Sequence, residues 1–238
     1  MKRSSLLALA AVASFALTAC HSVRPQEEKG FVSLFDGKTL KGWNGRSDLW
    51  SVRDGTITGE THAINPLKGN TFLVWTNGVV DNFELRFDYK ILNGNSGIQY
   101  RSQLLDPEAF VVGGYQADFE AGKTYSGILY EERQRGILAQ RGQRTVVRDV
   151  AGKTQVDVVG SVGDSAAIQA LIHDRDWNSY VVIANDNHLM HFINSKMTVD
   201  VVDNQAAKAA KSGILAFQIH AGPPMLVQFR NVRLRRLP

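Results

Sequence analysis

The chain has 238 residues, with 27 Lys and Arg against 23 Asp and Glu, and a single cysteine. Its modest positive charge is spread along the sequence and argues against a dedicated nucleic-acid binder, which would concentrate basic residues in a patch. One cysteine allows no disulfide within the chain, so the fold must rest on its hydrophobic core.

The first 19 residues are typical of a bacterial lipoprotein signal peptide. Lys2 and Arg3 precede the apolar run Leu6–Ala16, which is too short for a membrane span of about 20 residues. The run ends at Leu-Thr-Ala-Cys, a lipobox in which the Cys20 thiol would be lipidated. An ordinary signal peptide with an incidental cysteine is the alternative. Without residues 1–19 the basic residues fall to 25 and the net charge to about +2.

Residues 20–30 are polar and predict a short lipidated tether. His21 stands where an aspartate would favour retention in the inner membrane, which predicts an envelope protein anchored in the outer membrane and facing the periplasm. Residues 31–238 then form one domain, which is long enough to bury a substantial core.

The domain alternates apolar and polar residues with a period of two. The first signal is Asp54-Gly55, between two short alternating runs, which predicts a tight hairpin turn. The clearest strand is Phe83–Ile91, where apolar and charged residues alternate, as in a strand with one face in a core. Further strands are expected at Phe31–Phe35, Phe72–Trp75, Gly97–Arg101, Tyr115–Phe119, Gly127–Tyr130, Tyr180–Ala184, Leu189–Ile193, Ile214–His220 and Met225–Leu234.

Helix is favoured only in two short alanine-rich segments, Ser165–Leu171 and Asn204–Lys211. Many short strands separated by turn residues predict an all-β protein, and we expect a sandwich of two antiparallel sheets. Such a sandwich can curve and leave one concave face of polar and aromatic side chains, where a carbohydrate would lie.

Four strand segments carry polar side chains that alternation would direct to such a face. The uncharged glutamines among them suit hydrogen bonds to sugar hydroxyls. The alternatives are a solvated outer face, ion pairs of the acids with neighbouring arginines, or a core position for the histidine. In chain order the residues are Gln99 and Arg101, Gln116 and Asp118, and Gln218 and His220, while the segment Tyr125–Glu132 ends in Tyr130 and the paired acids Glu131 and Glu132.

Other catalytic and ligand-binding motifs are missing from the sequence. It contains no phosphate-binding glycine loop, dinucleotide fingerprint, nucleophile elbow or His-Glu-x-x-His motif. His188 and His191 lack a third ligand at a useful spacing, so we expect them at the surface and not in a zinc site.

Several ordered segments form a longer pattern. Residues 31–43 contain Leu-Phe-Asp-Gly-Lys-Thr-Leu-Lys-Gly-Trp, and residues 50–59 form a Trp-Ser-Val-Arg-Asp-Gly hairpin segment. Later landmarks lie at Asn95–Arg101, Gly114–Gln116, Gly127–Tyr130, Asp176–Asn178 and Phe229–Val232. Across residues 31–237 this pattern resembles the 3-keto-disaccharide hydrolase family, whose domain is also described as a 3-keto-glucoside 1,2-lyase and 3-keto-2-hydroxy-glucal hydratase.

The resemblance implies a concanavalin A-like jelly roll and the cleavage of glycosides already oxidised at C3. A ketone at C3 acidifies the C2 proton, so a base can remove it while the glycosidic oxygen leaves from C1, and rehydration completes a net hydrolysis. Such a site needs a base, an acid and a group that polarises the C3 oxygen. As hypotheses, His220, Asp118 and Glu131 are the catalytic acid or base, and Arg101, Gln116, Gln218, Tyr130 and Gln99 bind the substrate.

The sequence leaves open whether the protein needs a cofactor and which charge its substrate carries. No cofactor is certain, but a divalent metal ion could act as Lewis acid, with Asp118, Glu131 and His220 as ligands. The basic segment Arg133–Gln143 leaves open an acidic substrate. The main alternative to an enzyme is a non-catalytic carbohydrate-binding module at the cell surface, because the same fold serves lectins. A structural envelope lipoprotein is the third possibility.

Overall fold

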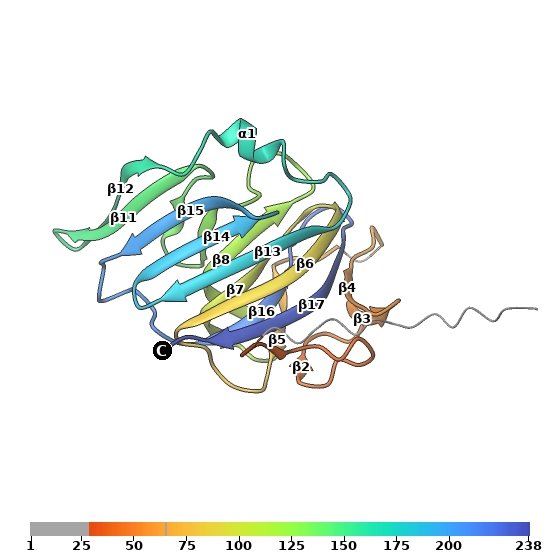
Figure 1. The fold of residues 1–238 in the computed structure, drawn as a ribbon. Helices are drawn as coiled ribbons and strands as arrows, with labels where there is room; N and C mark the ends of the chain where they lie inside the picture. Colours follow the sequence, from red (N-terminus) through yellow and green to blue (C-terminus); the bar gives the residue numbers. More distant parts are fainter. Residues whose placement is uncertain (1–28, 65) are drawn as a thin grey trace, which may run out of the picture.

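The structure is a computed structural model that describes residues 29–64 and 66–238. The predicted signal peptide, Cys20 and most of the tether lie outside the described residues. Within the described part, seventeen strands and one short helix build two stacked sheets (Figure 1). None of the described helical residues belongs to a segment long and apolar enough to cross a membrane.

The larger layer, called here the ten-stranded sheet, forms one face of the sandwich (Figure 1). Its neighbours pair antiparallel, except that β11 and β15 run parallel. From edge to edge the strands are β12 (Lys153–Ser161), β11 (Gln143–Val150), β15 (Lys196–Asp203), β14 (His188–Ile193), β13 (Asn178–Asn185), β6 (Phe83–Asn93), β17 (Leu226–Arg236), β4 (Thr56–Glu60) and β3 (Trp50–Arg53), and β1 (Val32–Ser33) adds beside β17.

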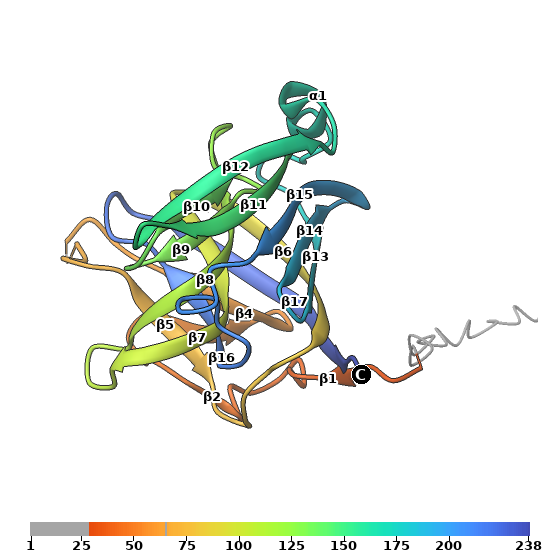
Figure 2. The same cartoon turned by 90° about the vertical axis from the view of Figure 1, so that its left-hand side faces the viewer.

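The second layer, called the seven-stranded sheet, lies behind the first and is seen from another side in Figure 2. Its neighbouring strands pair antiparallel throughout the described residues. Its strands, in order, are β10 (Gly136–Ala139), β9 (Leu129–Glu132), β8 (Val111–Glu120), β7 (Asn95–Asp106), β16 (Ile214–Ile219), β5 (Thr71–Trp75) and β2 (Trp43–Asn44). These two sheets confirm the predicted all-β jelly-roll class.

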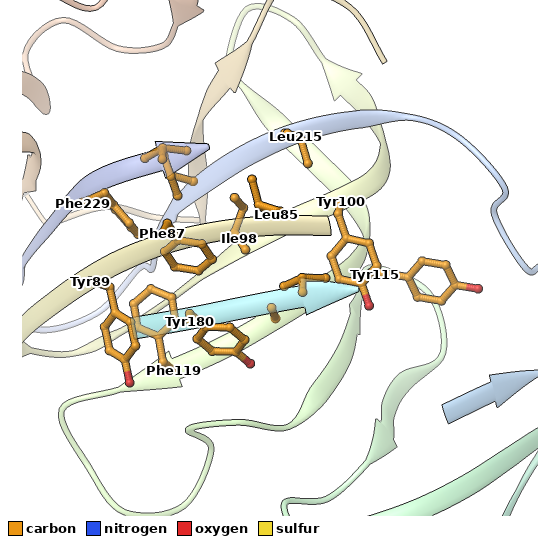
Figure 3. Packing of buried hydrophobic residues seen from close by; sticks show 14 of the residues in the cluster. Leu85, Phe87, Tyr89, Ile98, Tyr100, Tyr115, Phe119, Tyr180, Leu215 and Phe229 are labelled. Carbon is orange, nitrogen blue, oxygen red and sulfur yellow. The ribbon is translucent and has the colours of Figure 1, made fainter. Parts of the chain in front are cut away.

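Aromatic rings from both sheets fill the space between them (Figure 3). Phe217 of β16 stacks on Phe229 of β17 with 3.7 Å between ring centroids. Tyr89 of β6 stacks on Phe119 of β8 at 4.0 Å. Each fully buried ring of this kind contributes about 1.5–3 kcal/mol to the free energy of unfolding. The core therefore fixes which face of each strand points outward.

Several local expectations can be compared with these elements. The Asp54-Gly55 turn forms, with φ of 48° and 74°. Helix α1 (Ser165–Gln169) begins after Asp164, whose carboxylate accepts from the Ala167 N–H. The second helix prediction, Asn204–Lys211, is wrong, because that segment forms a turn after β15. Strands β11, β12 and β15 were not predicted, and β12 shows why: most of its residues are exposed, so no apolar alternation marks it.

Candidate active site

A groove of about 480 Å³ lies against β8, β9 and β16 of the seven-stranded sheet. Core residues such as Ala117, Leu129 and Phe217 alternate with the residues that line the groove. Because successive side chains of a strand point to opposite faces, the groove must occupy the outer face of this sheet. Its volume falls in the range of about 300–1,000 Å³ that small-molecule sites occupy.

A chain of side-chain amides crosses the floor of this groove. Gln99 Nε2 donates to Gln116 Oε1 at 2.6 Å, and Gln116 Nε2 lies 3.4 Å from Gln218 Oε1. Gln218 Nε2 in turn points to Glu132 Oε2 at 3.4 Å. Asn70 Nδ2 approaches the other oxygen of Glu132 at 3.3 Å. Each glutamine thus donates to the next residue of the chain, and the last donates to the Glu132 carboxylate. These hydrogen bonds orient the carboxylate.

These contacts also show the shape of the sheet. Gln218 lies on β16 and Glu132 on β9, and β7 and β8 separate those two strands in the sheet. Neighbouring strands are about 4.8 Å apart, so the two side chains can approach to 3.4 Å only if the sheet curves toward them. The groove therefore lies on a concave face, as the sandwich prediction expected.

Asp118 and Glu132 are both buried carboxyl groups of the groove, and the two residues are 6% and 8% exposed. Burial raises the pKa of Asp118 well above the usual range, and the nearby carboxylates of Glu120 and Glu132 add to the rise. The Asn95 amide, which donates to Asp118 Oδ1 at 2.9 Å, only partly opposes this effect. The raised pKa favours the protonated form of Asp118, which can donate a proton.

His220 follows β16 and lines the rim of the groove, where it is exposed. Its Nδ1 lies 2.5 Å from the carbonyl oxygen of Ala221. A carbonyl only accepts, so Nδ1 carries a proton, and in the neutral ring this leaves Nε2 as an acceptor. Asn70 Oδ1 accepts from the Ala221 N–H at 2.9 Å and ties this turn to the amide chain. Nε2 is thus a group that can bind or accept a proton at the rim.

The structure brings Gln116, Asp118, Tyr130, Gln218 and His220 to one groove, in agreement with their predicted common face. Burial also raises the pKa of the Tyr130 phenol, with Glu132 and Asp118 contributing, so its hydroxyl stays a donor. Gln99 is fully buried under this surface and reaches the groove only through its bond to Gln116.

The placement of Glu131 in the groove was wrong. Tyr130 and Glu132 both line the groove, so the residue between them must face the other side of β9. Glu131 is 1% exposed and forms an ion pair with Arg135, which also bonds Asp203 at 2.7 Å. Burial alone would lower the pKa of Arg135, but the hydrogen bonds to Glu131 and Asp203 outweigh it and raise the pKa. Glu132 is therefore the carboxylate of β9 that lines the groove, and strand alternation from Tyr130 was the signal for it.

Arg101 also lies away from the groove, contrary to its predicted position beside Gln99. The pairing of β7 with β8 shifts register after Tyr100, and Arg101 adopts a φ of 48°. This bulge breaks the alternation, so the two side chains no longer share a face. The buried guanidinium donates instead to the backbone carbonyls of Asp81, Asp186 and Ala210. Its role here is to hold connecting loops together.

The metal-ligand set Asp118, Glu131 and His220 does not converge, because Glu131 faces the other side of its strand. Within residues 29–64 and 66–238, no other group of three His, Cys, Asp or Glu side chains is placed to hold an ion.

The groove carries acids but no cation. Asp118, Glu120 and Glu132 line it, and none of its lining residues in the described chain is Lys or Arg. Two arginines of the basic segment have other partners: Arg135 pairs with buried acids, and Arg141 donates to four backbone carbonyls. An acidic substrate would therefore meet like charge in the groove.

Comparison with solved structures places this fold beside proteins of related architecture. A provisionally named glycosyl hydrolase from Parabacteroides distasonis superposes with a TM-score of 0.56 at 20% identity, over 88% of this chain and 94% of that one. A Bacillus subtilis protein of unknown function with a galectin-like fold gives a TM-score of 0.53 at 11% identity, over 83% and 90% of the two chains. At these identities the likeness shows the fold alone.

Sequence comparison goes further. A Bacteroides thetaiotaomicron protein named 3-keto-disaccharide hydrolase is 34% identical over 89 residues, which is 33% of this chain and 30% of that protein. This match spans less than a third of the relative. The family model of the 3-keto-alpha-glucoside-1,2-lyase-like domain, in contrast, matches residues 30–235. That match covers both sheets and the whole groove, and the chain therefore belongs to the 3-keto-alpha-glucoside-1,2-lyase-like domain family.

Proposed function

We propose that this protein is a carbohydrate-active enzyme that cleaves neutral glycosides carrying a ketone at C3, and that the reaction takes place in the groove of the seven-stranded sheet. The observation that carries the proposal is the presence of two carboxyl groups in unlike surroundings there: burial raises the pKa of Asp118, while amides orient the carboxylate of Glu132. Family membership and the name of the Bacteroides thetaiotaomicron relative support the substrate class.

In the proposed reaction, Glu132 takes the proton from C2 of the sugar, which the C3 ketone has acidified. The electron pair passes through an enolate at C2–C3 and then forms the C1–C2 double bond as the bond from C1 to the glycosidic oxygen breaks. Asp118 gives its proton to that leaving oxygen, so the aglycone departs as a neutral alcohol. The other product is the 3-keto-2-hydroxy-glycal.

Rehydration of this product completes a net hydrolysis. Water adds its hydroxyl to C1 and its proton ends on C2, which restores the saturated sugar. In the proposal, His220 Nε2, an acceptor at the exposed rim, takes a proton from that water. Tyr130 and Gln116 offer hydroxyl and amide groups for the sugar oxygens along the groove. This two-step order accommodates both the lyase and the hydrolase names of the family.

The direct test is incubation of the purified protein with a 3-keto-glucoside that bears a chromogenic aglycone. We expect release of the aglycone together with the 3-keto-2-hydroxy-glycal or its hydrated product, followed by absorbance and mass spectrometry. Parallel reactions with and without a chelator report any dependence on a metal ion. If aglycone is retained while sugar binding is measurable, the activity proposal is wrong.

The neighbouring glutamates offer a matched pair of variants. We expect Glu132→Gln to lower turnover at least about 100-fold with little change in melting temperature, because it removes a proton acceptor and keeps the shape of the side chain. Glu131→Gln leaves Arg135 and Asp203 incompletely paired in the interior and should cost about 3–5 kcal/mol of unfolding free energy. At a temperature where it stays folded, it should keep its turnover. Kinetics and thermal melts of both variants decide, and full turnover in Glu132→Gln would remove this residue from the reaction.

His220 provides a separate test of the rim. We expect His220→Ala to abolish net hydrolysis without unfolding the domain, since the side chain is exposed. If His220 acts on the water, the unsaturated intermediate should accumulate in this variant. Unchanged formation of the hydrated product would exclude His220 from the site.

A non-catalytic carbohydrate-binding module is the second candidate, and one observation favours it. The floor of the groove is mostly uncharged amide, from Gln116, Gln218 and Asn70, and such groups bind sugar hydroxyls without any reaction. In that case ordinary disaccharides should bind as well as their 3-keto derivatives, which a titration calorimeter can compare.

We also propose that the protein is lipidated at Cys20 and anchored in the outer membrane, facing the periplasm. The support is the lipobox that precedes Cys20 and the histidine that follows it. Mass spectrometry of the mature N-terminal peptide and membrane fractionation test this directly. An unlipidated N-terminus, or a Cys20→Ala variant that fractionates like the native protein, would contradict it.

A further inference from the structure

The outer face of the ten-stranded sheet carries a strip of basic side chains along β6 and β17, which pair with each other (Figure 1). These side chains alternate with core residues such as Phe87 and Phe229, so they point away from the interior of the sandwich. The groove lies on the outer face of the other sheet, so the two features face opposite directions. We call these residues the basic strip: Arg86, Lys90, Arg230, Arg233 and Arg235.

The acids of β6 and β17 do not balance this strip. They are Glu84, which pairs with Arg86 and Arg235, and Asp88, which pairs with Arg230. The side chains of Glu84 and Asp88 are 8% and 22% exposed, against 31–41% for their arginine partners, so the cations lie nearer to solvent. Five basic and two acidic side chains leave an excess of three positive charges. At the far edge of the sheet, in contrast, each outward arginine of β11 has one acid partner, in the pairs Arg144–Asp200 and Arg148–Asp157.

Aromatic and aliphatic side chains share this face with the basic strip. The guanidinium groups of three strip arginines lie over the Phe31 ring, 4.6–5.9 Å from its centroid, and that of Arg230 lies 3.9 Å from the centroid of Trp177. Cations among aromatic and aliphatic groups are typical of surfaces that bind at the membrane–water interface. Beside Arg86 the face continues with partly exposed apolar residues of β13 and β14: Val181, Ile183, Met190 and Phe192.

The domain also begins on this face. A Cβ at Gly30 would lie 3.3 Å from Arg235 Cδ, so the chain passes directly over a strip arginine before Phe31. Lys29 is nine positions after Cys20 in the sequence, a length that spans at most about 30 Å. A domain of this size is roughly 40 Å across. A lipid on Cys20 would therefore hold the strip face, and not the groove, toward the bilayer.

We propose that the basic strip and the apolar side chains beside it form a docking surface for an anionic phospholipid bilayer. The strip arginines bind headgroup phosphates, while Phe31, Trp177 and the aliphatic side chains lie at the interface between headgroups and acyl chains. The setting rests on the proposed anchoring at Cys20, but the contact itself needs no lipid on the protein. In this orientation the groove opens away from the membrane, toward soluble glycosides.

The test uses the chain from His21 to Pro238, which is the proposed mature protein without its lipidated residue, so that only the surface can hold it on a membrane. We expect it to sediment with vesicles of phosphatidylethanolamine and phosphatidylglycerol, to be released as salt is raised, and not to sediment with phosphatidylcholine vesicles. Two double variants remove charge from opposite ends of the strip: Arg233→Gln with Arg235→Gln, and Lys90→Gln with Arg230→Gln. Each should weaken vesicle binding about 10-fold, and thermal melts report whether each variant remains folded.

Lys68→Gln with Arg133→Gln is the matched control, because both residues are exposed and lie next to the groove residues Asn70 and Glu132 in the sequence. It removes the same charge from the groove side and should bind vesicles as the native chain does. The strip variants should keep their turnover of the 3-keto-glucoside in solution. Vesicle binding and catalysis can therefore fail independently.

Tryptophan fluorescence gives a second measurement of which face meets the membrane. Trp177 is half-buried on the strip face, whereas Trp43, Trp50 and Trp75 are buried. Vesicles that contain brominated phosphatidylglycerol should quench the native chain, and Trp177→Phe should lose this quenching. The inference is overturned if the chain does not bind anionic vesicles at low salt, if it binds phosphatidylcholine equally well, or if both strip variants bind and quench as the native chain does.

Discussion

At the residue scale, the position of a carboxyl group in a strand decides its chemistry. Glu131 and Glu132 are adjacent in sequence, yet one is neutralised by Arg135 in the interior and the other faces the groove. Asp118 is buried on the groove side of its sheet. Burial is the largest influence on its pKa, which it raises. Its folded-state pKa is therefore higher than the value of about 3.9 in an unfolded chain.

This shift makes a prediction about stability and pH. Between pH 4 and the raised pKa of Asp118, the folded protein binds more protons than the unfolded chain, so the contribution of this group falls as pH rises. Asp118→Asn removes that penalty. We expect the variant to melt at a higher temperature than the native protein at neutral pH, with a difference that grows as pH rises and vanishes below pH 4.

Thermal melts from pH 4 to 9 measure this difference, and a constant offset between the two proteins would contradict it. The same variant should lose turnover, because an amide cannot protonate the leaving oxygen. Stability that rises while activity falls is the expected signature of an acid kept at a cost to the fold.

At the element scale, the groove depends on a glycine of β7 that carries no side chain. Gly97 pairs with Asp118 of β8 and presents no side chain to the groove. A Cβ at this position would lie 2.6 Å from Gln116 Cγ and 2.9 Å from the Ala117 carbonyl oxygen. The missing side chain is what lets Gln116 reach across β7 toward Gln218 on β16. The continuous amide chain is thus a property of three strands and not of one.

We expect Gly97→Ala to displace Gln116, to raise KM for the 3-keto-glucoside about 10-fold and to cost about 1–3 kcal/mol through overpacking. Gly69→Ala is the control, because a Cβ there meets nothing within 4 Å. Steady-state kinetics and thermal melts of both variants test this. Native kinetics in Gly97→Ala would show that the amide chain does not position the substrate.

At the scale of the whole molecule, a buried polar contact joins the two sheets. His191 of β14 was expected at the surface, but it is fully buried, with Nε2 2.9 Å from the Tyr100 hydroxyl on β7. Its Nδ1 lies 3.3 Å from the Tyr180 hydroxyl on β13. Burial lowers the pKa of His191 to about 3, so the ring is neutral in the folded protein. In β14 every second residue is buried, and His191 lies on the buried face with Leu189 and Ile193.

The low pKa predicts acid sensitivity. An unfolded histidine titrates near pH 6.5, so below that pH the unfolded chain takes up a proton that the folded one does not. Stability from this group is complete above pH 6.5 and is lost as pH falls toward 3. We expect His191→Gln to flatten the fall in melting temperature over this range. Equal slopes for the native chain and His191→Gln would contradict the assignment.

The sequence by itself determined the fold class, most strands and the common face of Gln116, Asp118, Gln218 and His220, because period-two burial is a local property of a strand. It also pointed to the family through ordered motifs, which the family model confirms. Only the tertiary structure decided which way the Arg101 side chain points, because a bulge reverses the alternation there. It also decided that Asn70 and Gln218 converge on Glu132. Those outcomes depend on how a sheet bends and where its register shifts, which are set by packing between distant segments and leave no periodic trace in the sequence.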